Sequence, residues 1–394
     1  MARVRGSTPR FSLLCFGFVV CGIVTVLPGP LLPVMAARWR LPDVQSGAFF
    51  GAEFLTSTLA AILSSRRLRW SLPSGYALMT AGVLLLLLSG ETTRGTLGHA
   101  LALGGFGLIG LGTGLSVTAT NLTVGGGATG AGERARRLSI VNLGWGIGAV
   151  ACPWLVAAAE RNQSIAGLLL VIAAGTAGMF VALAPLLHRP PAAFIAAPRT
   201  ALAAEAPVLA FFAVFLFLYV GVETVVGGWI TTYAHRFSGM TLEHASLLVS
   251  LYWTALLAGR GAGSVALKRL PERGILMAGL GISLLAVAAL VRPQSSTVTL
   301  AAVAVAGFGF GPVFPVGVSR MLTRVIDQRH TGLVFGICAS GGAVLPWLTG
   351  LVSTQSGSLR TGFSVAVAAA AVLAILAAVE GAVLRKPAAA GPAL

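Results

Sequence analysis

The sequence predicts an all-α protein that crosses a membrane many times, with twelve transmembrane helices in two six-helix bundles related by pseudo-twofold symmetry. Three observations predict this fold: the apolar composition, the number of helix-length apolar stretches, and the repetition of one half of the chain in the other. Of 394 residues, 56% are hydrophobic and 10% are charged, whereas a soluble domain has about 25% charged residues. So few charges cannot form the shell of a soluble protein of this size. The composition therefore excludes a soluble enzyme, a secreted disulfide-rich protein and a disordered chain.

The net charge of +16 bears on which negatively charged partner the surface of the protein contacts. In a soluble protein this charge would favour nucleic acid, but here we expect the basic residues to lie in short loops that face the anionic lipid bilayer. The four cysteines, Cys15, Cys21, Cys152 and Cys338, lie in apolar runs and lack the spacing of metal ligands. We therefore expect no nucleic acid, no metal and no cofactor, and no pattern of an enzyme active site is present.

Twelve stretches are long and apolar enough to cross about 30 Å of hydrocarbon as helices. They are residues 11–33, 44–64, 74–89, 99–121, 139–159, 165–187, 208–233, 244–267, 275–291, 298–322, 332–353 and 362–384. The first follows three arginines and resembles a signal peptide, but its length and the similar stretches after it favour a retained helix.

The distribution of Lys and Arg predicts the orientation in the membrane. With the N-terminus in the cytoplasm, twenty of the 27 basic residues fall in segments on the inner side and seven fall on the outer side. The outer seven are Arg38, Arg40, Arg94, Arg161, Arg236, Arg292 and Arg360. Because cytoplasmic loops carry the excess of Lys and Arg, we expect both termini in the cytoplasm and the protein in the cell (inner) membrane.

The longest inner connection divides the chain into two parts. Residues 188–206 contain three prolines and a fourth follows at Pro207, a composition typical of a linker. We expect an N-terminal six-helix bundle at residues 1–187 and a C-terminal bundle with a short cytoplasmic tail at residues 207–394.

The two halves repeat each other in sequence at a separation of roughly 190 to 200 residues. The matching pairs are residues 22–29 (GIVTVLPG) with 221–228 (GVETVVGG), 148–155 (GAVACPWL) with 342–348 (GAVLPWL), and 105–107 with 307–309 (GFG in both). Parallel repeats of this kind are typical of transporters that bind their substrate near the midplane, between halves that rock against each other.

Twelve helices, two matching halves and a basic, Pro-rich central loop resemble the major facilitator superfamily over nearly the whole chain. Within it, three segments are similar to the fucose/glucose/galactose–proton symporter group: residues 219–229 (YVGVETVVGGW), 311–317 (GPVFPVG) and 341–350 (GGAVLPWLTG). The resemblance implies alternating access and uptake of a hexose or a similar small neutral solute together with protons.

The chain departs from this family in two respects. The loop after the second predicted helix, residues 64–70 (SSRRLRW), has the basic residues of the superfamily's signature but lacks its Asp. Fucose permeases carry coupling carboxylates on helices 1 and 4, and this chain has none there. Proton coupling, if it occurs, must therefore use other residues.

Glu223 and Glu53 are the candidates for proton coupling, because an ionisable group inside a membrane span is expensive and often functional. Glu223 lies in the seventh predicted helix, opposite Val24 in the repeat, and Glu53 lies near mid-depth in the second. The structural alternative is a carboxylate that hydrogen-bonds between packed helices. Glu160 and Arg161 are predicted to be an exposed loop pair of little consequence.

A neutral polyol needs uncharged hydrogen-bonding groups and aromatic faces. The candidates for substrate binding are Asn121, Asn142, Trp145, Trp229, Tyr252, Trp253, Phe314, Ser340 and Trp347, although a residue of this kind taken alone more often serves packing. A second set is expected to bend helices or to support gating: Pro28, Pro30, Gly227, Gly228, Pro312 and Pro315, with Arg260 as a structural residue near a helix end. Gly227 and Gly228 in particular are expected to let the seventh helix bend or break.

The leading hypothesis is a monomeric secondary transporter that couples protons to the uptake of a hexose-like solute. The first alternative is an exporter of amphipathic compounds or drugs by proton antiport, which suits an apolar cavity better. A receptor or scaffold without transport is a third class, and no sequence feature favours it. Sodium is an alternative coupling ion, because a carboxylate with helix carbonyls also binds it.

Overall fold

The computed structural model describes residues 11–64, 68–91, 95–126, 131–185, 202–292, 295–325 and 331–384. Over these residues the chain is helical and contains no strand. The helices are α1 (Phe11–Val26), α2 (Pro28–Trp39), α3 (Asp43–Ser64), α4 (Leu68–Glu91), α5 (Gly95–Gly126), α6 (Ala131–Arg161), α7 (Ile165–Leu183), α8 (Leu202–Phe237), α9 (Leu242–Ala266), α10 (Glu272–Ala289), α11 (Ser296–Phe310), α12 (Val313–Leu322), α13 (Thr331–Ser356), α14 (Leu359–Gly362) and α15 (Ser364–Val383).

The fifteen helices of the described residues form the twelve predicted spans. The two numbers differ because three spans consist of two helices each. Helices α1 and α2 form the first span, α11 and α12 the tenth, and α14 and α15 the twelfth. Ten segments of the described chain are long and apolar enough to cross a membrane. The other two spans, α3 and α9, carry Ser, Thr and charged side chains among their apolar residues. Both pack against the opposite half of the molecule, where such side chains avoid lipid.

Proline interrupts the first and tenth spans where the sequence predicts it. Pro28 and Pro30 follow the end of α1, and Leu27 separates α1 from α2. In the tenth span, α11 ends at Phe310 and Pro312 precedes α12. Proline removes a backbone donor and displaces the preceding turn, so a helix ends or kinks there. Of the predicted bend or break near Gly227 and Gly228, the break is wrong, because α8 runs without interruption from Leu202 to Phe237; the bend stays a prediction.

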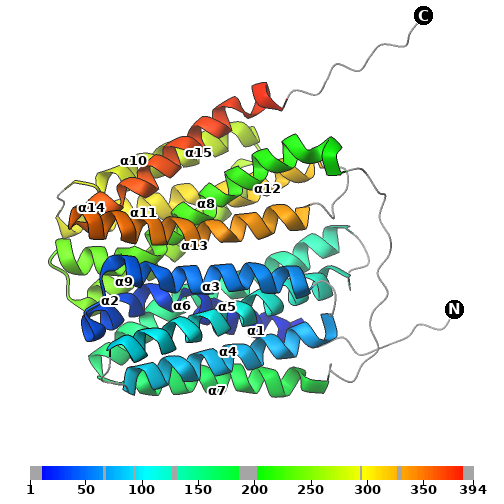
Figure 1. Cartoon of the computed structure of the whole chain (residues 1–394). Helices are drawn as coiled ribbons and strands as arrows, with labels where there is room; N and C mark the ends of the chain where they lie inside the picture. The colour runs from blue at the N-terminus through cyan, green and yellow to red at the C-terminus, as the bar shows by residue number, and fades with distance from the viewer. Residues whose placement is uncertain are drawn as a thin grey trace, which may run out of the picture.

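The helices form two bundles, α1–α7 and α8–α15, which lie side by side with their axes roughly parallel (Figure 1). Both the start of α1 and the end of α15 lie at one end of the molecule, which we call the terminal end. The opposite end, where α2 ends and α3 begins, is the far end. The predicted linker, residues 188–206, lies outside the described residues except for the start of α8.

Small residues bring helices of each bundle into backbone contact, and they do so in equivalent places. In the N-terminal bundle, Gly105 of α5 faces Gly82 of α4, where an added Cβ on either residue would lie within 2.9 Å of the other's carbonyl oxygen. In the C-terminal bundle, Gly309 of α11 faces Gly279 of α10 in the same way, within 2.7 Å. Such contacts are typical of helices in membranes, and one glycine of each contact, Gly105 or Gly309, lies in the repeated GFG segment.

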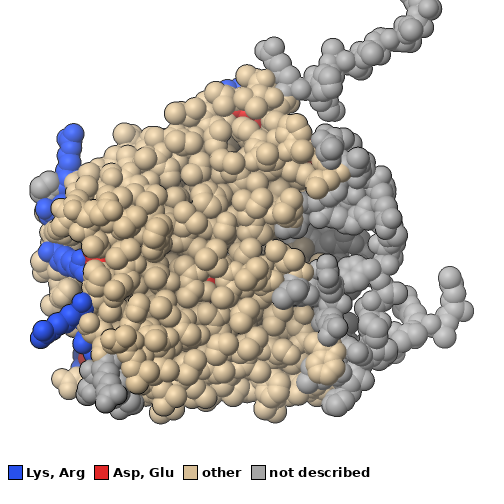
Figure 2. Space-filling view, in the orientation of Figure 1, with Lys and Arg blue, Asp and Glu red and all other residues tan. Residues whose placement is uncertain are grey.

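The lateral surface is suited to lipid. Figure 2 shows Lys and Arg gathered at the far end of the visible face, with a broad belt free of them between the two ends. Large apolar side chains point outward within the helices of this belt, and Val171, Val181 and Leu285 are 67–73% exposed. Exposed apolar side chains at this density are expected where hydrocarbon replaces water. The chain is therefore a multi-pass membrane protein.

Candidate functional site

The far end of the molecule is closed by an ion pair between the two halves. Asp43, at the start of α3, accepts hydrogen bonds at 2.8 Å from both terminal nitrogens of Arg236, near the end of α8. Ser353 of α13 donates a third hydrogen bond to the same carboxylate at 2.5 Å. The backbone N–H of Val44 also donates to Thr354 at 3.0 Å. Two bundles are thus joined at a carboxylate that is only 8% exposed.

The sequence interpretation did not select this pair. Asp43 directly precedes the predicted span at residues 44–64, and Arg236 follows the predicted span at residues 208–233 on the same side of the membrane. Their opposite charges at one membrane face are the signal that could have identified the pair, although sequence alone does not show which basic residue the carboxylate meets.

Glycines that lie nearer the middle of the molecule than the ion pair allow the two halves to touch. A Cβ added to Gly29 of α2 would lie 2.9 Å from the carbonyl oxygen of Gly227, and one added to Gly228 would lie 2.5 Å from the ring of Phe50. Gly227 and Gly228 therefore provide a close contact between the halves instead of the predicted helix break. A glycine inside a helix permits either outcome, and the presence of a partner helix decides between them.

Trp229 lies inside this contact. Its side chain has no exposed surface, and its indole N–H donates to the carbonyl of Pro346 at 3.1 Å. Its ring packs against Phe50, with 6.3 Å between the ring centroids. In this conformation the predicted sugar-binding face of Trp229 is covered by the opposite half.

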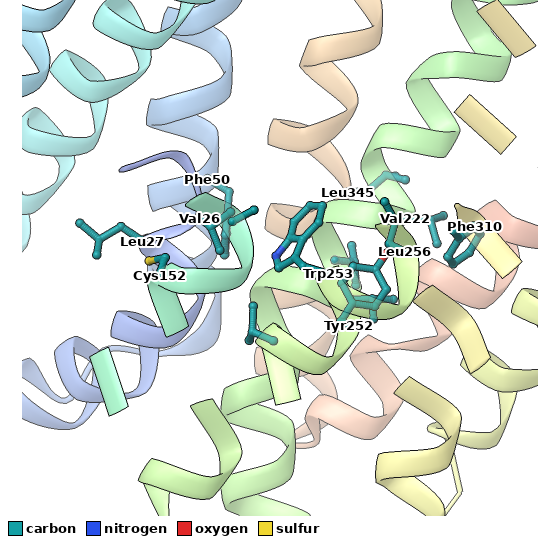
Figure 3. Close-up of a cluster of buried hydrophobic side chains, with 14 of the residues drawn as sticks. Val26, Leu27, Phe50, Cys152, Val222, Tyr252, Trp253, Leu256, Phe310 and Leu345 are labelled. Carbon is teal, nitrogen blue, oxygen red and sulfur yellow. The ribbon is translucent and has the colours of Figure 1, made fainter. Parts of the chain in front are cut away.

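Closer to the centre, an aromatic pair crosses between the halves. The rings of Trp145 in α6 and Trp253 in α9 meet edge to face with centroids 5.4 Å apart, and Tyr252 packs on Trp253 at 5.5 Å. Figure 3 shows Trp253 between Phe50 of one half and Leu256 of the other. The described residues offer no hydrogen-bond partner to the Trp253 indole N–H or to the Tyr252 hydroxyl. Buried polar groups without partners are what a ligand with hydroxyl groups can satisfy.

Glu223 lies in a cluster of polar side chains within the C-terminal half. The Tyr219 hydroxyl lies 2.9 Å from a Glu223 carboxylate oxygen and 3.1 Å from the carbonyl oxygen of Phe310, so it can donate to either. A terminal nitrogen of Arg260 lies 3.5 Å from the same carboxylate oxygen. The side chains of Glu223 and Arg260 are 13% and 32% exposed. Arg260, predicted to be structural, thus holds the carboxylate that is predicted to carry protons.

The neighbours of this cluster connect it to the aromatic pair. Tyr252 lies within electrostatic range of both Glu223 and Arg260, and it also contacts Trp253. Phe314 of α12 packs on Tyr219 with ring centroids 5.6 Å apart. The predicted residues Glu223, Arg260, Tyr252, Trp253 and Phe314 therefore lie together, on three spans of the C-terminal half.

Glu53 has a different environment. It is 1% exposed, and neither of its carboxylate oxygens has a hydrogen-bond partner among the described residues. Its helix packs closely on α5, where Thr56 donates to the carbonyl of Gly107 at 2.8 Å. Cys152 of α6, itself fully buried, lies within electrostatic range of the carboxylate. An ionised carboxylate in such surroundings is costly unless it is paired.

The remaining predicted residues are spread over both halves. The Asn142 amide donates to the Asn121 side chain at 3.3 Å, which joins α6 to α5 near the terminal end. Ser340 donates to the carbonyl of Ile337 within its own helix at 2.6 Å. Trp347 is 41% exposed. Among these residues, only the two asparagines contact each other.

The described residues contain no group of three or more His, Cys, Asp or Glu side chains that could hold a metal ion. The candidate side chains are two ion pairs, Asp43–Arg236 and Glu223–Arg260, the isolated carboxylate of Glu53, and a set of aromatic and amide groups. This arrangement suits the binding of a small organic solute.

Comparison with known proteins agrees with this description. Among curated proteins, the chain is 31% identical over 137 residues to Sodium-dependent glucose transporter 1 of Danio rerio, across 34% of this chain and 23% of that protein. It is 24% identical over 164 residues to Bypass of stop codon protein 6 of Saccharomyces cerevisiae, across 38% of this chain and 33% of that protein. The chain thus matches a third or less of the length of these relatives.

Solved structures match over almost the whole chain. FucP in the outward conformation has a TM-score of 0.62 at 20% identity and covers 93% of this chain and 97% of its own. The D-xylose-proton symporter has a TM-score of 0.72 at 14% identity, with coverage of 93% and 96%. The nucleoside transporter NupG has a TM-score of 0.68 at 16% identity, with coverage of 96% and 98%. At these identities the likeness shows the fold alone.

The family model described as "Major Facilitator Superfamily" matches residues 14–343. This match covers most of the chain and extends into both halves. The chain therefore belongs to the Major Facilitator Superfamily, whose members are membrane transporters and not enzymes.

Proposed function

We propose that this transporter couples the uptake of a hexose or a similar small neutral solute to protons by alternating access. The cluster of Glu223, Arg260 and Tyr219 carries the proposal, because it places an ionisable carboxylate about 21 Å from the far end of α8, at 1.5 Å per residue. An intramembrane carboxylate with a basic partner is typical of proton pathways. When Glu223 accepts a proton, Arg260 loses its partner and becomes free to bind a solute hydroxyl.

The solute would bind between the halves, beside the Trp145–Trp253 pair. The free indole N–H of Trp253 and the free hydroxyl of Tyr252 offer hydrogen bonds, and the rings offer flat faces for the C–H surface of a sugar. Asn121 and Asn142 add amide groups nearer the terminal end. Among the similar proteins, the glucose transporter, the fucose:proton symporter FucP and the D-xylose-proton symporter support this class of solute, and the nucleoside transporter NupG widens it.

In the proposed orientation, the far end faces the outside of the cell and both termini lie in the cytoplasm. The structure then represents a state that is closed outward by Asp43 and Arg236. Helices α6 and α9 meet from the Arg161–Glu243 ion pair to the contact of Gly146 with Leu257. One turn nearer the terminal end, Asn142 is exposed. We propose that the path opens on this side, with halves at residues 1–187 and 207–394 that rock as units in a monomer.

Purified protein in liposomes that contain a pH-sensitive dye tests the proposal. A panel of hexoses is added outside and internal acidification is followed, for the native protein and for Glu223→Gln, Glu53→Gln and the control Glu272→Gln, whose carboxylate lies at the terminal end. We expect sugar-driven acidification that Glu223→Gln abolishes and Glu272→Gln preserves.

Other results have defined meanings. A signal that survives Glu223→Gln but not Glu53→Gln assigns proton coupling to the enclosed carboxylate of the N-terminal half. Uptake that follows a sodium gradient instead identifies sodium as the coupling ion. The absence of a signal with every sugar refutes hexose symport. It favours the alternative, export of amphipathic compounds, for which the apolar cluster in Figure 3 provides a suitable wall.

A further inference from the structure

A cavity lies at the far end, apart from the Glu223 cluster and the Trp145–Trp253 pair. Its volume is about 640 Å³, and it lies among the ends of α2, α4, α6, α7 and α9. Helices α2, α4, α6 and α7 belong to the N-terminal half, whereas Leu242 and Glu243 at the start of α9 belong to the C-terminal half. The cavity therefore spans the boundary between the halves on the side where they are closed.

The wall of this cavity is largely apolar. Leu31 and Met35 of α2, Leu86 of α4 and Leu169 of α7 line it, and each of these is less than 9% exposed. A molecule of the size that fits here would bury most of its apolar surface, as small-molecule sites usually require.

Two polar groups in the wall lack a partner among the described residues: the indole N–H of Trp39, a donor, and the carboxylate of Glu160, an acceptor. Both carboxylate oxygens of Glu160 are enclosed, and neither has a hydrogen-bond partner among the described residues. The sequence interpretation, which placed Glu160 in an exposed loop, is wrong, because α6 extends to Arg161 and turns Glu160 inward. Arg161 pairs instead with Glu243 at 3.6 Å. Arg38 also lines the cavity, but its side chain is exposed and makes no ion pair with a described carboxylate within 4.0 Å.

We propose that this cavity binds an amphipathic amine, with the ammonium group at Glu160 and the hydrocarbon part against the leucines. An enclosed carboxylate without a partner attracts a cation and repels an anion, and a charge-assisted hydrogen bond would satisfy it. A neutral apolar molecule would leave the carboxylate unsatisfied. The described residues contain no group of three or more acidic, His or Cys side chains, so the cavity does not offer the ligands of a metal ion.

Occupancy of the cavity would hold the far end closed. When the halves part at the far end, α9 moves away from α2 and α6, so the cavity loses the side that Leu242 and Glu243 form. A ligand that contacts both halves stabilises the closed arrangement by mass action. The amine would therefore inhibit transport without competing with the solute. This consequence rests on the proposed transport cycle, whereas the binding does not.

Equilibrium binding of phenethylammonium to the full-length protein in lipid nanodiscs tests the proposal, with empty nanodiscs as background. Its neutral analogue, 2-phenylethanol, has nearly the same shape. We expect the amine to bind about tenfold more tightly than the alcohol, the usual value of one charge-assisted contact. Glu160→Gln should remove this difference, and Glu223→Gln should leave it unchanged.

A second variant tests the position of the site independently. Ala166 of α7 lines the cavity and is exposed, so Ala166→Trp fills the space without disturbing the core. We expect it to weaken binding of both the amine and the alcohol. Gel filtration and Tm check that each variant folds. If Ala166→Trp does not fold, the result for Glu160→Gln alone decides whether the amine binds in this cavity.

Three results would overturn the proposal: no saturable binding of the amine, binding that Glu160→Gln leaves unchanged, or binding that Glu223→Gln abolishes, which would place the amine in the central site. The measurement uses the resting protein and needs no transport. Failure of hexose symport would therefore leave the binding result intact.

Discussion

Replacing Asp43 with asparagine should shift the molecule towards a state that is open at the far end. Asp43 accepts two hydrogen bonds from Arg236 at 2.8 Å and one from Ser353 at 2.5 Å. A hydrogen bond to a charged group contributes about 1.5–3 kcal/mol. Arg236 is 38% exposed, so water weakens its share of this energy. We expect Asp43→Asn to destabilise the closed state by about 2 kcal/mol, which is about thirtyfold in the equilibrium constant.

Distance measurement between spin labels detects this shift. Arg40 at the end of α2 and Arg292 after α10 are exposed at the far end, one in each half, so cysteines at these positions can carry the labels in a protein without native cysteines. We expect Asp43→Asn to increase the population with the longer distance. Arg236→Gln should act similarly, and the double variant should add little, because both changes break the same pair.

A control separates this effect from a general loss of charge at the far end. Arg360 stacks on Phe237 within the C-terminal half, 4.4 Å from the ring centroid, and donates to the Phe237 carbonyl at 3.4 Å. Arg360→Gln should leave the distance distribution unchanged. The reasoning is refuted if Asp43→Asn has no effect, or if Arg360→Gln has the same effect.

Three further changes have expected outcomes. In Gly350→Ala the new Cβ would collide with the carbonyl oxygen of Asp43 in the opposite half. The spin labels should therefore report the same opening as in Asp43→Asn, and an unchanged distance would contradict this contact. Tyr219→Phe removes the hydrogen bond to Glu223, which should lower the free energy of unfolding by about 1 kcal/mol. It should also change the pH profile of transport, and a profile identical to the native one would show that the hydroxyl does not act on the carboxylate. Phe363 is fully buried against Tyr233 at 5.1 Å between centroids, so Phe363→Ala should cost about 3–5 kcal/mol, measured as a lower Tm in detergent, and a loss below about 1 kcal/mol would place the ring outside the core.

The sequence predicted the spans well because hydropathy and helix length decide them. The breaks after α1 and α11 were predictable for a similar reason, since the proline ring alone ends the backbone pattern. The helix ends were less predictable. Helix α4 begins at Leu68, before the predicted start at residue 74, and α6 begins at Ala131, before residue 139. These turns carry charges and extend beyond the apolar segment, so hydropathy does not register them.

The polar contacts were predictable only in part. Glu223 could be identified because an ionisable group inside a membrane span is energetically costly. Its partner Arg260 lies on another helix, and no spacing in the sequence connects the two residues. The functions of Gly227 and Gly228 were misread because a missing side chain serves flexibility and close approach equally well. Glu160 was misread because its environment depends on four other helices that meet at the far end. Tertiary packing decides each of these cases.

The contact between α3 and α13 runs along most of the length of both helices. It begins at Asp43 and Gly350 and continues to Thr58 and Gly336. A Cβ added to Gly336 would lie 3.7 Å from the methyl carbon of Thr58. In the closed state, a contact of this length forms a barrier on one flank of the molecule. A solute dissolved in the bilayer could therefore not slip sideways between these two helices. Lateral entry from lipid, where it occurs, is restricted to the opposite flank, where α6 and α9 meet over only part of their length.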